Sequence, residues 1–110
     1  MTNQKLAEAF AQGENKGQAN SMYIKDLKTS TVIYSYGEHF PIAIRTSDMF
    51  AYVTNSKYSS TTSKQTTYVK RAMEAEHLQT EEKTCEELKQ LVSEISRRNY
   101  QEYRKINHLD

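Results

Sequence analysis

Apolar residues alternate with polar ones in the first half of the chain and recur at helical spacing in the second half. A short strand is predicted at Tyr23-Ile24, and residues 31–36, which are β-branched or aromatic almost throughout, predict a second. Residues 40–45 alternate cleanly between apolar and polar positions, and residues 49–54 predict one more strand. The connections are too short for helical crossovers, so an antiparallel meander of about four strands is predicted within residues 21–62. Pro41 has no N–H and is expected on an edge strand or at a strand's start.

Helical periodicity takes over in residues 63–110, where two helices are predicted, at 64–78 and 81–106. Thr80 followed by two glutamates is a suitable N-cap for the second helix. Residues 1–20 are interpreted as a flexible or short helical lead-in, with a helix at 6–11 and a linker at 13–21. The expected fold is one α+β domain, residues 1–110, with a meander of about four strands followed by two helices, the last one long.

The last predicted helix is longer than its sheet requires, and its apolar stripe is heptad-like. Leu88, Val92 and Ile95 lead to Asn99, a polar residue at a core position that commonly fixes helix register. Hydrophobic residues make up only 36% of the chain and tryptophan is absent, which favours further burial by self-association. We therefore expect a dimer or larger homo-oligomer through this stripe. The alternative is that the helix packs across its own sheet.

Bulk composition narrows the class of function. A net charge of +1 argues against a broad nucleic-acid surface, so nucleic acid is not an expected partner. The single cysteine, Cys85, fits a reducing cytoplasm, and no apolar run suggests a membrane segment. One cysteine and three scattered histidines do not predict a zinc site, and no cofactor is expected. His39 is a candidate general base, but no nucleophile is linked to it, so an enzyme is not expected.

The run of hydroxyl and lysine residues at 57–64 joins the predicted sheet to the first predicted helix. Hydroxyls, a helix N-terminus and lysines suit a phosphate or carboxylate. Between residues 45 and 71 only Asp48 opposes five basic residues. The run contains no glycine-rich phosphate loop. The alternative is that its hydroxyls only cap the helix.

A second basic and aromatic segment occupies residues 97–105, and its arginines suit phosphate binding or base stacking. The alternative is helix-dipole complementarity, because the preceding residues 81–94 are mainly acidic. Tyrosines such as Tyr34, Tyr36, Tyr52 and Tyr103 offer further rings. The candidate ligand-binding residues are Arg45, Tyr58, Ser59, Thr61, Thr62, Ser63, Lys64, Arg97, Arg98, Tyr100 and Arg104. If an oligomer brings the two clusters together, Lys64→Ala or Arg97→Ala should weaken binding.

The segments YSYGEHFPIAIR (34–45) and NSKYSSTTSKQ (55–65) resemble a small domain common in bacteriophages and mobile elements. That domain has the approximate pattern YSYGxHFPIA followed by YSxTTSK, and often a histidine after the lysine, where this chain has Gln65. The resemblance does not cover the last predicted helix, and it implies a small phage accessory protein. The layout is similar to phage anti-Thoeris sponges, which sequester cyclic nucleotide immune signals.

Three functions follow as hypotheses. The first is a counter-defence protein that binds and sequesters a phosphorylated, cyclic nucleotide signal without cleaving it. The second is a protein inhibitor or adaptor of a host defence complex, of the anti-CRISPR type. The third is a small nucleic-acid-binding module, which the near-neutral charge disfavours.

Overall fold

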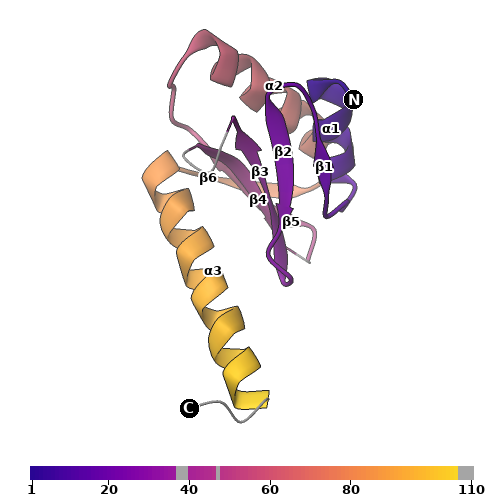
Figure 1. Cartoon of the computed structure of the whole chain (residues 1–110). Helices are drawn as coiled ribbons and strands as arrows, with labels where there is room; N and C mark the ends of the chain where they lie inside the picture. The colour runs from indigo at the N-terminus through magenta and orange to yellow at the C-terminus, as the bar shows by residue number, and fades with distance from the viewer. Residues whose placement is uncertain (37–39, 47, 107–110) are drawn as a thin grey trace.

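The described part of the chain forms one six-stranded sheet with three helices (Figure 1). The structure is a computed structural model that describes residues 1–36, 40–46 and 48–106. The elements are α1 (Asn3–Ala11), β1 (Gly17–Gln18), β2 (Met22–Asp26), β3 (Ser30–Ser35), β4 (Pro41–Thr46), β5 (Phe50–Thr54), α2 (Ser60–Ala75), β6 (Gln79–Lys83) and α3 (Cys85–Ile106). The strands lie in chain order, antiparallel from β1 to β5, and β6 pairs in parallel with β5.

The α+β class and the four-stranded meander are confirmed by β2 to β5. Pro41 opens β4, a strand in the interior of the sheet, and pairs with Tyr34 where the register shifts after Ile33. A proline is tolerated at the first residue of a strand because the ladder there can do without its N–H. Of the two positions expected for Pro41, the strand start is correct and the edge strand is not.

The prediction of a helix from residue 81, capped by Thr80, is wrong. Residues 79–83 form β6, and α2 is the crossover that carries the chain back to pair in parallel with the edge of β5. The helix begins at Cys85, after Thr84 and Glu87 exchange hydrogen bonds of 2.9 and 3.1 Å in the pattern of a capping box. Thr84 therefore has the capping role predicted for Thr80.

The N-terminal segment is part of the fold, although it was predicted as a lead-in. Thr2 caps α1, whose Leu6 and Phe10 are fully buried in one core with Val69 and Met73 of α2. The expected linker contains β1, which pairs with β2. Helices α1 and α2 thus cover the same face of the sheet, and α2 runs somewhat earlier than the predicted 64–78.

Helix α3 packs on a second, smaller core, which confirms the alternative that it lies across its own sheet. Leu88 is fully buried against Val32, Tyr34 and Ile44, while Leu91, Val92 and Ile95 are partly buried there. The side-chain amide of Asn99 donates a hydrogen bond to the carbonyl oxygen of Leu27. The stripe through which we expected self-association therefore binds the chain's own sheet and the β2–β3 turn.

Both faces of the central strands are consequently covered. Residues 41–44 are all buried, instead of showing the two-faced pattern expected for the strand at 40–45. This is the usual result when helices lie on both sides of a sheet. None of the described helices is both long and apolar enough to span a bilayer.

Candidate functional site

The hydroxyl run begins with a helix cap. Ser59 is the N-cap of α2, and its hydroxyl accepts a hydrogen bond of 3.2 Å from the Thr62 N–H. The Thr62 hydroxyl accepts one of 2.9 Å from the Ser59 N–H. This reciprocal capping box is the role that the alternative interpretation gave to these residues. The first turn of α2 therefore already uses one of its N–H groups within the chain.

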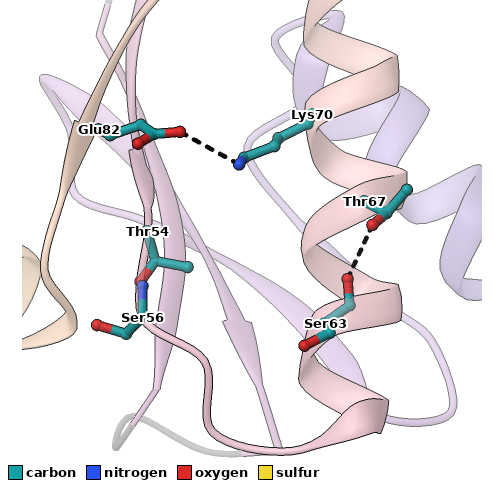
Figure 2. A network of polar contacts seen from close by, with 6 residues as sticks. All are labelled: Thr54, Ser56, Ser63, Thr67, Lys70 and Glu82. Atoms are coloured by element: carbon teal, nitrogen blue, oxygen red, sulfur yellow. Dashed lines mark hydrogen bonds and ion pairs between the residues drawn. The ribbon is translucent and has the colours of Figure 1, made fainter.

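A shallow hydroxyl-lined groove lies between the end of β5 and the side of α2. It is lined by Thr54, which ends β5, by Ser56, and by Ser63 and Thr67 of α2, all labelled in Figure 2. The Thr67 hydroxyl donates to the backbone oxygen of Ser63 at 2.9 Å, as is common for threonine in helices. At one end Lys70 pairs with Glu82 of β6 at 3.4 Å. With a volume of about 170 Å³, the groove is small for an organic ligand.

A larger pocket opens on the other side of the 55–59 segment, with a volume of about 520 Å³. It lies between the end of β3, the start of β4 and the first turns of α2 and α3. We call it the Tyr58 pocket. It is lined by Ser35, Tyr36, Phe40, Ser56, Lys57, Tyr58, Thr62, Cys85, Glu86 and Lys89. Its volume falls within the range typical of small-molecule sites.

Aromatic rings form one wall of the Tyr58 pocket. The rings of Phe40 and Tyr58 are tilted against each other with centroids 5.8 Å apart, and Phe40 is buried while Tyr58 is 80% exposed. Tyr36 is 70% exposed and adopts the left-handed backbone conformation, with φ of 64°. A non-glycine residue seldom takes this conformation, and such residues gather at functional sites. The wall thus presents two flat, accessible surfaces.

Two lysines and one glutamate provide the charges of the Tyr58 pocket. Lys89 lies 3.4 Å from Glu86, one turn earlier on α3, and this exposed pair is weak. Among the described residues, Lys57 forms no ion pair. The pocket therefore offers a cation that no described carboxylate neutralises, beside the two rings.

Cys85 begins α3 at the floor of this pocket, and its N–H donates a hydrogen bond of 2.9 Å to the Ser56 hydroxyl. Burial raises the pKa of the Cys85 thiol, an effect that Lys89 only partly offsets. A thiol with a raised pKa stays protonated at neutral pH and is a poor nucleophile. The environment of Cys85 therefore does not activate it.

A buried polar network supports the pocket from below. The Ser35 hydroxyl donates to the Gln65 side-chain oxygen at 2.5 Å, and the Gln65 amide donates to the Ser21 hydroxyl at 2.7 Å. Asn3 of α1 also donates to the Ser21 hydroxyl, at 2.9 Å. Gln65 stands where the phage pattern has a histidine. In this structure Gln65 is buried, and its hydrogen bonds join α2 to Ser35 of β3 and to Ser21.

The structure places the predicted site residues in separate regions. Tyr58 and Thr62 line the pocket, and Ser59 caps α2 beside it. Thr61, Ser63 and Lys64 are exposed on the first turns of α2, with Ser63 in the groove. Arg45 lies at the far end of β4, where its side chain donates to the Ala11 carbonyl at 3.2 Å.

The second predicted cluster, Arg97, Arg98, Tyr100 and Arg104, lies in the C-terminal half of α3. Within it the Arg104 guanidinium lies 5.9 Å from the Tyr100 ring. The helix starts at the pocket and runs away from it, so Arg97 is about 18 Å from Cys85 along the axis. A single chain therefore does not bring the two clusters together.

Sequence reasoning missed several residues of the pocket. Tyr36 was noted only as one of many rings, and Lys57 only as nearby charge. Lys89 carried no signal, because only the packing of α3 brings it to the site. His39, the candidate general base, lies outside the described residues. The described residues hold no group of histidine, cysteine or acidic side chains that would bind a metal.

Comparisons with known proteins found no matching family model, no similar curated protein and no similar solved structure. The resemblance to the phage domain and to the anti-Thoeris sponges accordingly stays a prediction.

Proposed function

We propose that this protein binds and sequesters a small phosphorylated nucleotide in the Tyr58 pocket, without cleaving it. The observation that carries the proposal is the pocket's combination of accessible rings with unneutralised positive charge. Tyrosine rings stack on bases of any sequence, and lysine is a point charge suited to phosphate. In the biology that the phage resemblance suggests, the nucleotide would be a cyclic immune signal.

The absence of an activated nucleophile among the described pocket residues supports binding over catalysis. Burial raises the pKa of Cys85, the most reactive side-chain type among the lining residues, and so disfavours its reactive thiolate form. Bound ligand is therefore expected to be released unchanged on denaturation. Chromatography of the released material distinguishes this outcome from an enzyme, which would yield a cleaved product.

The binding test is calorimetric titration with cyclic ADP-ribose and cyclic di-AMP, beside adenosine and inorganic phosphate as partial ligands. Lys57→Ala should weaken binding of the cyclic probe about tenfold or more, because a hydrogen bond to a charged group contributes about 1.5–3 kcal/mol. Tyr58→Ala should weaken it by a similar factor, because stacking of a base on an aromatic ring contributes about 1–3 kcal/mol. Lys64→Ala is the matched control: the residue is basic and nearby but does not line the pocket. Bound probe should also slow alkylation of Cys85.

Two outcomes contradict the proposal. One is that none of these probes binds at millimolar concentration. The other is that a probe binds and both pocket variants retain the parent's affinity. If Lys64→Ala alone weakens binding, the ligand lies on the exposed start of α2, where the sequence analysis placed it.

The second candidate function, a protein inhibitor or adaptor, is favoured by the same two exposed tyrosines. Tyr36 and Tyr58 are 70% and 80% exposed, and tyrosine is enriched at the centres of protein interfaces. This candidate predicts that Tyr58→Ala abolishes capture of a host protein while nucleotides have no effect on that capture. Competition by a nucleotide would instead support the sequestering function.

A further inference from the structure

Helix α3 extends well beyond the sheet on which its first half packs. The molecule measures 46 Å along its longest axis and 25 Å along the other two, and Figure 1 shows the C-terminal part of α3 projecting beyond the sheet. After Asn99 the helix carries exposed apolar side chains, with Tyr100 at 59% and Ile106 at 69%. A side of α3 is thus available to a partner, although the apolar stripe of the helix is covered by the chain's own sheet.

Charge is strongly ordered along α3. Its first half holds Glu86, Glu87 and Glu94 against Lys89, and its second half holds four basic residues against Glu102. Among the described residues, the only ion pair within α3 joins Lys89 to Glu86. Two such helices packed antiparallel place each acidic half beside the other's basic half, whereas parallel packing opposes like charges.

One flank of α3 suits this arrangement. A helix turns 100° per residue, so Cys85, Lys89, Val92, Ser96 and Tyr100 follow one another along the same side. The N-terminal end of this flank borders the Tyr58 pocket, because Cys85 and Lys89 line it. Val92 is only partly buried by the sheet, and Tyr100 is exposed.

We propose that two copies of the chain associate antiparallel along this flank, with a two-fold axis that passes between the two α3 helices at the level of residue 95. Helical geometry then sets Glu86 opposite the partner's Arg104 and Lys89 beside the partner's Tyr100. Both contacts are favourable, the first an ion pair and the second a cation–π contact.

The same arrangement carries the partner's Tyr100 and Arg104 to the rim of the Tyr58 pocket. They would add a third accessible ring and an arginine fork to a site that otherwise has only lysine cations. This completion of the pocket rests on the proposed function, but the association itself does not. The antiparallel dimer accounts for the separation of the two predicted clusters within one chain. Each chain contributes Tyr58 and Thr62 to its own pocket, and Tyr100 and Arg104 to the pocket of its partner.

Cysteine cross-linking without any nucleotide tests the association. In a Cys85→Ser background, Glu86→Cys and Arg104→Cys are introduced together and the protein is oxidised at dilute concentration. Within one chain these positions are about 27 Å apart along α3, and a disulfide requires Cα atoms within about 7 Å. A disulfide between residues 86 and 104, found by peptide mass analysis, must therefore join two chains.

The expected result is a covalent dimer held by that disulfide, with light scattering giving the parent twice its 12.8 kDa mass. The matched control carries Glu86→Cys alone and should remain uncrosslinked. A monomeric parent, or a disulfide between two copies of residue 86, overturns the inference. A monomer that still binds a nucleotide probe overturns this inference and leaves the proposed function standing.

Discussion

At the scale of single residues, most polar side chains around the pocket already form hydrogen bonds within the chain. Ser59 and Thr62 satisfy each other, and Gln65 holds Ser35 in place at the pocket floor. Tyr58 differs from these residues, because most of its side chain is exposed and available to a ligand. The hydroxyls of the run therefore shape the site, and the rings and lysines around it provide its surface.

Replacing Gln65 tests the buried network. Gln65→Leu keeps a similar volume but leaves the buried Ser35 hydroxyl without its partner, and it removes one of the two hydrogen bonds to the Ser21 hydroxyl. An unsatisfied buried polar group costs about 1–3 kcal/mol, so the free energy of unfolding should fall by about that amount. Urea denaturation measures it. Lys64→Leu, at the exposed neighbouring position, should change it by no more than about 0.5 kcal/mol. Equal effects of the two substitutions would show that the network contributes nothing.

At the scale of elements, local patterns predicted what local interactions determine. The alternation and β-branched runs located β2 to β5 because those strands carry their own apolar residues. In contrast, β6 has the sequence QTEEK with no apolar residue, and its two glutamates also suit the first turn of a helix. It is a strand because α2 returns it to the edge of β5, and such non-local pairing leaves little trace in the sequence. Likewise, Lys89 reaches the pocket only through the packing of α3.

The cap of α3 should loosen at acid pH. Hydrogen bonds from the Thr84 N–H, and then from its side chain, lower the pKa of Glu87 below its ordinary value. A lowered pKa in the folded state means that the ionised carboxylate stabilises α3. This stabilisation is complete above the ordinary glutamate pKa of about 4.3 and is lost as the pH falls through the lowered value.

Glu87→Gln isolates this effect, because the amide oxygen can still accept from Thr84 but does not titrate. Helix content measured by circular dichroism should fall more between neutral and acid pH for the parent than for Glu87→Gln. If the two proteins show the same pH dependence, the carboxylate does not hold the cap.

At the scale of the whole molecule, one sheet separates two cores of unequal size. The larger core joins α1 and α2 to the sheet, and it includes residues the sequence analysis assigned to a lead-in. Leu6 and Phe10 recur at helical spacing, but a single buried turn of helix gives too weak a signal to predict its docking site. The smaller core beneath α3 leaves the far end of that helix exposed, where the proposed dimer would cover part of it.

Because α1 is part of the larger core, a cavity opened in α1 should destabilise the entire protein. Phe10 is fully buried between α1, α2 and the sheet, and replacing a buried phenylalanine with alanine usually costs about 3–5 kcal/mol. That loss is a large part of the 5–15 kcal/mol typical of a small domain. Phe10→Ala should therefore shift the whole urea transition, followed by both far-ultraviolet circular dichroism and tyrosine fluorescence. Tyr58→Ala, which removes an aromatic ring that is 80% exposed, is the matched control and should leave the transition almost unchanged without ligand. A Phe10→Ala protein as stable as this control would show that α1 contributes little to the larger core.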